Sequence, residues 1–274
     1  KQKKYFDQEL LTNPYPDTRI LHNTKKEVKK VMVGIDIEGP ELMLADKLGD
    51  IDLVIAHHPE GRGLSDLSAV MELQAEVLAD YGVPINIAQG LLKPRISEVA
   101  RGINPINHFR SVDMARMLDI GFMCVHTPCD NMVAQFLKSK IEGASPEYVS
   151  DIFEVLDTIE EYQLASKDGI GPVLFAGNKD NFCGKVAITE ITGGTEGTPA
   201  VYERLASAGI GTIIGMHMSE KHKKAADKAH VNALVTGHMS SDSIGVNLFI
   251  DELEKRGVEV VPCSGFTRVS RVNK

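Results

Sequence analysis

The stretch Asp52-Leu53-Val54-Ile55-Ala56-His57-His58-Pro59 places four apolar residues directly before two adjacent histidines and a proline. An unbroken apolar run of this length is typical of a strand that is buried on both faces of a mostly parallel sheet. Pro59 cannot donate to a sheet ladder, so the strand is expected to end at the histidines. Open α/β sheets bind ligands at the carboxyl ends of their strands. The stretch therefore predicts a buried strand that carries two imidazoles to a ligand-binding edge.

Similar runs recur along the chain and predict an α/β fold. Strand candidates lie at residues 30–37, 52–56, 120–125, 185–191, 212–215, 233–236 and 258–261. Segments with apolar residues at helical spacing lie between most of them. This alternation of strands and helical crossovers is typical of a parallel sheet. Residues 83–87 also predict a short strand, and residues 66–81 predict one helix. The first twenty-odd residues are polar and contain prolines, so we expect an irregular arm there.

A change in composition at residues 142–180 suggests that the chain is divided into two lobes. Glycines and prolines flank an acidic helix candidate at residues 151–162. We therefore predict an N-terminal α/β lobe over residues 1–145 and a C-terminal α/β lobe over residues 146–274.

The composition is that of an ordinary globular protein, with 274 residues, 43% of them hydrophobic and 25% charged. The net charge of -8 and the lack of an arginine-rich run argue against nucleic acid as the main partner. No apolar run approaches the roughly 20 residues of a membrane span, so we expect no membrane partner. The basic start, Lys1 to Tyr5, is followed by no apolar segment, which argues against a signal peptide. The four cysteines form no Cys-x-x-Cys pair, and a cytoplasmic chain with reduced thiols is the simplest interpretation.

Three predicted strand ends carry side chains of the kind that bind metal ions. These side chains are His57 and His58 at the first, His126 and Asp130 at the second, and His238 and Asp242 at the third. At the second and third, the histidine and the carboxylate are four residues apart, which places both on one face of a helical turn. Mixed imidazole and carboxylate ligands suit zinc, iron or manganese better than calcium or magnesium. Two metal ions about 3.5–4 Å apart would need a bridging carboxylate.

Each of these residues also has an interpretation without a metal. Asp130 and Asp242 can cap the helices that follow them. His126 can hydrogen-bond a backbone carbonyl, and His57 and His58 can be one core histidine and one solvated histidine. The coincidence of three similar strand ends favours the metal site, but the residues alone leave both interpretations open.

Three motifs, in this order, resemble the signatures of the Nif-three family, also called the GTP cyclohydrolase 1 type 2 family. They are AHHPEGRG at 56–63, VHTPCDNMV at 125–133 and TGHMSSDSIG at 236–245. The family typically shows His-His-Pro, then His-Thr-x-x-Asp, then Gly-His-x-x-(Ser/Thr)-Glu, and the resemblance covers residues 30–265. It implies two α/β lobes, a dinuclear metal site in the cleft between them and a ring-shaped homohexamer.

By position, the resemblance implies five ligands for two divalent transition-metal ions. These ligands are His57, His58, Asp130, His238 and Asp242. Asp130 would bridge the two ions, and His126 matches the motif histidine close to them. Asp242 stands where the family usually has glutamate, so its shorter side chain could move or weaken one metal.

Two further features of the sequence could contribute to the same site. His217 falls where relatives often carry a glutamate, and with Glu220 it either faces the cleft or belongs to a solvated helix start. The loop at 193–197, Gly-Gly-Thr-Glu-Gly, follows a strand and precedes a helix, so its N–H groups could receive a phosphate. It has no Walker lysine, and a tight strand-to-helix turn is the alternative interpretation.

Two functions fit this pattern. The first is a metal-dependent hydrolase of a small nucleotide-like or phosphate-bearing substrate, in which His126 or His217 would transfer protons. The family name implies opening of the guanine ring of GTP, but a family alone does not establish a reaction. The second is a non-enzymatic scaffold that holds or delivers metal through protein partners. Basic residues in the cleft would favour the hydrolase, and the candidates are Arg62, Lys93 and Arg95.

Overall fold

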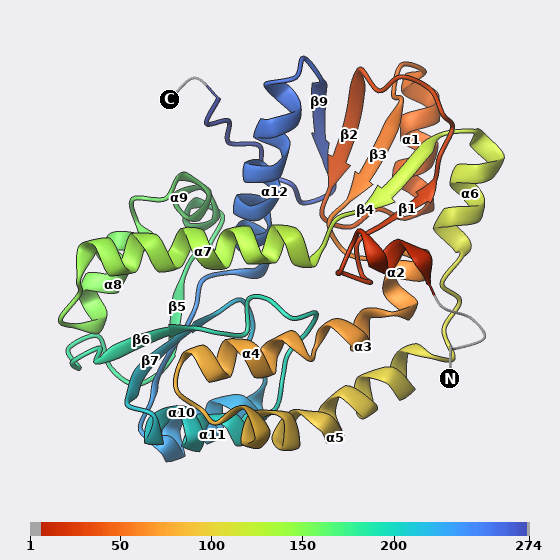
Figure 1. Ribbon diagram of the computed structural model, residues 1–274. Coiled ribbons are helices and arrows are strands. Elements are labelled where there is room, and N and C mark those ends of the chain that lie inside the picture. The colour runs from red at the N-terminus through yellow and green to blue at the C-terminus, as the bar shows by residue number, and fades with distance from the viewer. Residues whose placement is uncertain (1–6, 273–274) are drawn as a thin grey trace.

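The computed structural model describes residues 7–272, which form two sheets surrounded by helices (Figure 1). The predicted α/β class is confirmed, because strands alternate with helices along most of the chain and both sheets are largely parallel. The basic start at residues 1–5 lies outside the described residues. Within residues 7–272, none of the helices combines the length and the hydropathy needed to cross a membrane.

The first sheet has the predicted strand of residues 52–56 at its centre. Its strand order is β1 (Arg19–His22), β4 (Gly121–Cys124), β3 (Leu53–Ala56), β2 (Lys30–Gly34) and β9 (Glu259–Cys263). β2, β3, β4 and β9 run parallel, and β1 pairs antiparallel with β4 at one edge. Val54 and Ala56 on one face and Ile55 on the other are buried in two separate cores. Burial on both faces explains why β3 is an unbroken apolar run.

The second sheet has four strands. Their order is β5 (Val173–Ala176), β8 (Asn232–Val235), β7 (Ile210–Gly215) and β6 (Lys185–Ile188). β6, β7 and β8 run parallel, and β5 pairs antiparallel with β8 at the edge. β7 and β8 are almost fully buried, whereas β5 exposes Val173 and Phe175.

Helices connect the strands and cover the sheets. In chain order they are η1 (Gln8–Leu11), α1 (Gly39–Leu48), α2 (Gly61–Ser65), α3 (Leu67–Val70), α4 (Leu73–Asp80), α5 (Ile85–Ile103), α6 (Arg110–Leu118), α7 (Thr127–Ala144), α8 (Val149–Leu156), α9 (Glu160–Lys167), η2 (Pro199–Val201), α10 (Tyr202–Ser207), α11 (Glu220–Ala229) and α12 (His238–Glu254). Figure 1 shows α7 running between the two sheets and α12 beside β9.

Several local predictions are corrected by these bounds. The strand predicted at 83–87 does not form, because Pro84 cannot pair in a strand interior; Pro84 is instead the N-cap of α5, which begins at Ile85. The single helix predicted at 66–81 is divided into α3 and α4. The acidic helix at 151–162 is divided into α8 and α9. The arm is not wholly irregular, since residues 19–22 form the edge strand β1.

The two sheets do not follow the order of the chain. β9 lies far beyond residue 145, yet it pairs with β2 in the first sheet. Leu78 of α4 and Leu92 of α5 precede residue 145, yet they belong to the core on the second sheet. The division into lobes at residues 145 and 146 stays a prediction, and any lobes share these crossing segments.

Helices α7 and α12 meet at a close backbone contact. A Cβ atom added to Gly245 would lie 2.3 Å from the carbonyl oxygen of Cys129, so any side chain at Gly245 would separate the two helices. Leu137 of α7 packs in the core on the second sheet, and Ile250 of α12 packs in the core on the first. The contact between these helices therefore joins the two sheets and brings the first turns of α7 and α12 together.

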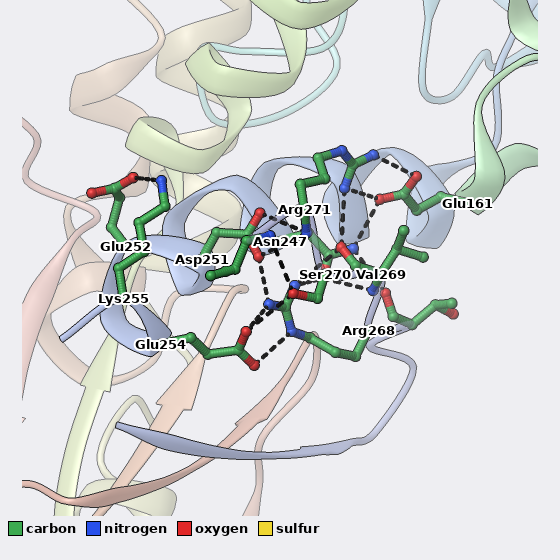
Figure 2. Close-up of polar contacts among 12 residues, drawn as sticks. Glu161, Asn247, Asp251, Glu252, Glu254, Lys255, Arg268, Val269, Ser270 and Arg271 are labelled. Atoms are coloured by element: carbon green, nitrogen blue, oxygen red, sulfur yellow. Dashed lines mark hydrogen bonds and ion pairs between the residues drawn. The ribbon is translucent and has the colours of Figure 1, made fainter. Parts of the chain in front are cut away.

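The C-terminal segment is held to the molecule by buried ion pairs (Figure 2). Arg271 donates two hydrogen bonds of 2.8 Å to the carboxylate of Glu161 on α9, and that carboxylate is fully buried. Arg268 pairs with Asp251 of α12 and donates to the side-chain oxygen of Asn247 at 2.9 Å. Asn247 in turn donates to Glu161 at 2.9 Å. Bidentate arginine–carboxylate pairs have strict geometry, so this network fixes the end of the chain against α9 and α12.

Candidate metal centre

The three histidine motifs follow the carboxyl ends of β3, β4 and β8. His57 and His58 directly follow β3, and their N–H groups donate to Gly34 and Ile35 at 2.9 Å. The backbone N–H of His126 donates to the Thr18 side chain at 3.1 Å, and α7 begins at the next residue. The third motif begins α12. β3 and β4 are parallel neighbours, and the contact between α7 and α12 brings the third motif to the same place.

Asp242 lies at the centre of this cluster. Its Oδ1 is 3.5 Å from Nε2 of His57, and its Oδ2 is 3.5 Å from Nε2 of His58 and 3.5 Å from Nε2 of His238. The Asp242 side chain is fully buried. One carboxylate therefore faces three imidazoles that come from two different sheets.

Asp130 completes the cluster from the first turn of α7. Its Oδ1 is 3.3 Å from Nε2 of His57, and its Oδ2 is 3.7 Å from Nε2 of His126. Three groups have ligand atoms within 4.8 Å of one another and could hold a metal ion: His57, Asp130 and Asp242; His58, His238 and Asp242; and His57, His58 and His126. The structure thus brings all six predicted motif residues together.

Three of the histidines are oriented by partners on their other ring nitrogen. Nδ1 of His57 lies 3.0 Å from the Val125 carbonyl, and Nδ1 of His58 lies 2.6 Å from Asp36. Nδ1 of His126 lies 2.8 Å from Asp17. An Nδ1–H that donates to oxygen leaves Nε2 unprotonated and free to bind a metal, and this is the usual arrangement of metal-ligating histidines.

Asp17 and Asp36 were not among the residues predicted from the sequence. Asp17 belongs to the segment predicted as an irregular arm, where it accepts hydrogen bonds from His126 and, at 2.6 Å, from Thr127. No local pattern marks it. Asp36 lies two residues beyond β2, the neighbour of β3, so a carboxylate at an adjacent strand end was a usable signal.

The chemistry of the cluster fits a metal ion. His57 Nε2, Asp130 Oδ1 and both oxygens of Asp242 are buried and have no hydrogen-bond partner. An unsatisfied buried polar group costs about 1–3 kcal/mol, and more when it is charged. A cation among these atoms would satisfy all of them at once, and the nitrogen and oxygen donors suit zinc, iron or manganese.

Without a cation, protons bound to the histidines balance the negative charge of the carboxylates. Burial alone would lower the pKa of His57, but the carboxylates of Asp242 and Asp130 raise this pKa well above its usual value. Burial alone would raise the pKa of Asp242, and the surrounding histidines hold it well below its usual range. A metal ion that binds here would displace protons from the histidines, so its affinity must rise with pH.

A cavity of about 260 Å³ opens beside the cluster. Its wall includes His58, His126, Asp130, His217, His238 and Glu190. The wall contains no lysine or arginine from residues 7–272. Of the basic candidates, Arg62 pairs with Asp7 at 2.8 Å, and Arg95 donates to the Glu196 carbonyl at 3.1 Å.

His217 lines this cavity. Of the two positions predicted for it, the structure shows the one that faces the cleft and not the solvated helix start. Its ring lies 5.4 Å from the ring of His238, and burial lowers its pKa, so it is a neutral imidazole at pH 7. Glu220 does not accompany it. Glu220 is exposed on α11 and pairs with Lys224 at 3.1 Å.

The loop at 193–197 also faces the cavity through Gly194 and Thr195. Gln74 of α4 is buried and holds this loop by donating to the Gly193 carbonyl at 2.8 Å and to the Thr195 carbonyl at 2.6 Å. The loop leads into η2, which continues into α10, so a helix follows the loop as predicted and begins with a short 3-10 turn.

The fold and the cluster define a mixed α/β protein with buried histidine and aspartate groups that could hold a metal ion. Among solved structures, the chain is similar to a NIF3 superfamily protein from Sphaerobacter thermophilus, with 30% identity and a TM-score of 0.84 over 91% of each chain. The chain therefore belongs to the NIF3 superfamily, as its three motifs predicted. Comparisons with protein-family models and with curated proteins found no match.

Two more distant structures share the fold alone. TTHA1606 from Thermus thermophilus is 14% identical, with a TM-score of 0.55 over 96% of this chain and 94% of that one. Reduced HcgD from Methanocaldococcus jannaschii is 16% identical, with a TM-score of 0.53 over 89% of this chain and 87% of that one.

Proposed function

We propose that this protein binds two divalent transition-metal ions and uses them to hydrolyse a small substrate. The proposed ligands are His57, His58, Asp130, His238 and Asp242. The observation that carries the proposal is the set of buried, unpaired donor atoms in the wall of a cavity. A site built only to stabilise the fold would have no use for a cavity that reaches its polar groups.

Asp242 would help to hold both ions. It is the carboxylate common to two of the candidate groups, one with His57 and Asp130 and the other with His58 and His238. Its Oδ1 faces the first group and its Oδ2 faces the second. Asp130 was expected to bridge by family resemblance, but its oxygens face His57 and His126.

The metal ions, when bound, would polarise the scissile bond and lower the pKa of water toward neutrality. The side chains around them supply proton transfer. Asp17 holds the Nδ1 side of His126, so Nε2 of this histidine can accept the proton that the attacking water loses. His217, kept neutral by burial, is a second proton acceptor on the cavity wall.

The size of the cavity supports a small substrate. Drug-sized ligands occupy pockets of about 300–1,000 Å³, and this cavity is about 260 Å³. A phosphate group of the substrate would be held by the metal ions, because within residues 7–272 no lysine or arginine lines the cavity. The GTP reaction in the family's other name gains no support from the cavity, because within residues 7–272 no lysine or arginine lines it to pair with a triphosphate.

A metal-delivery scaffold is the second candidate function. Two of the proposed ligands favour it, since the side chains of His58 and His238 are 26% and 39% exposed. Ligands that water can reach allow a metal ion to leave and enter without unfolding. A scaffold would bind metal through the same residues but would turn over no substrate.

Assembly and location complete the proposal. We propose a closed homo-oligomer, a hexamer by family resemblance, in the cytoplasm. Reduced thiols support the location, since all four cysteines are unpaired and three of them are buried. An exposed apolar group near His238 supports assembly: Ile170, Val173 and Phe175 are 61%, 44% and 47% exposed.

One experiment separates the hydrolase from the scaffold. Metal content and turnover of nucleotides, phosphoesters and small amides are measured together for the wild type and for His58→Ala, His238→Ala and His126→Ala. For a hydrolase, the first two variants lose metal and activity, whereas His126→Ala keeps its metal and loses about 10²-fold or more in rate. His230→Asn is the histidine control, because Asn tolerates the left-handed backbone of that position (φ 55°). A metal-replete wild type that hydrolyses nothing leaves only the scaffold.

A further inference from the structure

Glu190 is a carboxylate of the cavity wall that the three metal motifs do not include. It lies two residues beyond β6, at the carboxyl end of the second sheet, and it lines the same cavity as His126 and His217. Its backbone has φ 52°, a left-handed conformation that costs a residue with a Cβ about 1–2 kcal/mol. The carbonyl of Glu190 accepts a hydrogen bond from Met216 at 3.2 Å, which fixes this conformation beside β7. Strained residues of this kind cluster at functional sites.

Within residues 7–272, only one of the two carboxyl oxygens of Glu190 has a hydrogen-bond partner. Oε2 accepts a hydrogen bond from the N–H of Gly197 at 3.0 Å. Within residues 7–272, Oε1 has no hydrogen-bond partner, and neither oxygen pairs with a lysine or arginine. Oε1 is therefore free to hydrogen-bond a ligand, and Glu190 belongs to the wall of the cavity that would hold one.

The surroundings keep this carboxyl group protonated near neutral pH. Burial raises the pKa of Glu190 to about 7, against the opposing hydrogen bond from Gly197. Among the charged neighbours, Glu196 raises this pKa further and Arg95 lowers it. Tyr202 faces the group from α10 and stays neutral, because burial raises the pKa of its phenol far above the usual value. A carboxylic acid with a pKa near the working pH is an efficient general acid.

We propose that Glu190 is the proton donor to the leaving group in the hydrolysis that this cavity carries out. The inference rests on the proposed function. Water forms a bond to the reacting centre of the substrate and gives one proton to Nε2 of His126. The bond to the leaving group breaks, and the leaving group keeps the electron pair and takes the proton of Glu190 Oε1. His126 then holds one extra proton and Glu190 lacks one, and exchange with solvent restores both.

The test compares Glu190→Gln with Glu60→Gln in the metal-loaded protein. The amide of Glu190→Gln keeps a carbonyl oxygen that accepts from Gly197, so fold and metal content should be unchanged. Glu60 is the matched control: burial raises its pKa to about 7 as well, but it does not line the cavity. We expect kcat to fall about 10²-fold or more in Glu190→Gln with KM little changed. The wild-type kcat should fall as pH rises through 7, and this decrease should be absent from Glu190→Gln and retained in Glu60→Gln.

Binding of inorganic phosphate, measured by calorimetry, gives a readout that does not depend on turnover. A protonated Glu190 donates to phosphate and an ionised one repels it, so the wild-type Kd should rise by up to about tenfold from pH 6 to pH 8. Glu190→Gln, which is neutral and a donor at both pH values, should show a much smaller rise.

Equal pH dependence of phosphate binding in wild type and Glu190→Gln would overturn the inference. So would a wild-type kcat in Glu190→Gln, and the hydrolase would then still stand. A wild type that turns over no substrate is a different result, because it removes the proposed function itself and, with it, any leaving group for Glu190 to protonate.

Discussion

The ionisation of one residue, Glu60, makes the free energy of unfolding depend on pH. Burial raises its pKa from 4.5 to about 7, against an opposing hydrogen bond from Ser111. Because the folded pKa is above the unfolded one, the native state binds the proton more tightly, and stability falls as pH rises from about 4.5 to about 7. Glu60→Gln removes this loss. We expect its unfolding free energy to exceed that of the wild type by about 1 kcal/mol at pH 8, after allowance for solvent screening.

Urea denaturation of metal-free protein at pH 4 and pH 8 measures this effect. At pH 4 both states hold the proton, so wild type and variant should have the same midpoint apart from the small cost of the amide. A variant that is equally stabilised at both pH values would show that the charge of Glu60 is not the cause.

The residues that sequence could identify are those with a local pattern. His57, His58, His126, Asp130, His238 and Asp242 each belong to a motif at a strand end, and the structure brings all six together. Asp17 and Glu190 have no such pattern. Asp17 reaches His126 from 109 positions away in the chain, and Glu190 reaches the cavity from a strained turn that only the packed structure can hold.

At the scale of elements, the parallel strands were predictable, and the two antiparallel edge strands, β1 and β5, were not. β3 and β4 are apolar on both faces, which gives a continuous signal. β1 exposes Ile20, and β5 exposes Val173 and Phe175, so neither sequence contains the buried apolar run that marks β3 and β4. Pro84 was the local signal against a strand at residues 83–87, because it is the N-cap residue directly before α5.

Gln74 links two elements whose contact the cavity needs. Its amide donates to the carbonyls of Gly193 and Thr195. Without it, the Gly193 carbonyl would keep only the Thr195 N–H at 3.2 Å, and the partly buried Thr195 carbonyl would lose its donor. We expect Gln74→Ala to lower the unfolding free energy by about 2–3 kcal/mol and to loosen residues 193–197. Denaturant unfolding measures the first effect, and amide hydrogen exchange of the loop measures the second. Gln135→Ala on the exposed face of α7 is the control and should change neither.

One experimental result would contradict the prediction for Gln74→Ala. If the loop exchanged as slowly in Gln74→Ala as in the wild type, other contacts would hold it, and α4 would have no part in shaping the cavity wall.

At the scale of the whole molecule, the site exists because the chain crosses between the two sheets. β9 returns to the first sheet after the second is complete, and α12, which precedes β9, carries His238 and Asp242 across. Helix order and strand order do not reveal this crossing, so sequence could predict two α/β halves but not which segments belong to each sheet. The absence of a side chain at Gly245 allows the approach of α7 and α12 that the cluster needs.

The exposed apolar surface at β5 leads to a prediction about assembly. Val173 and Phe175 lie exposed on the edge strand β5, and Ile170 just before it is more exposed still. Exposed apolar edges invite pairing with another chain, and a symmetric oligomer would bury this surface beside His238. We expect light scattering to give a mass that is a multiple of the 29.9 kDa chain, six-fold by family resemblance. Phe175→Glu should lower that mass, whereas Met117→Glu, at an 85% exposed position on α6, should not. A stable monomer at micromolar concentration would contradict the closed oligomer, and an unchanged mass in Phe175→Glu would place the subunit contact elsewhere.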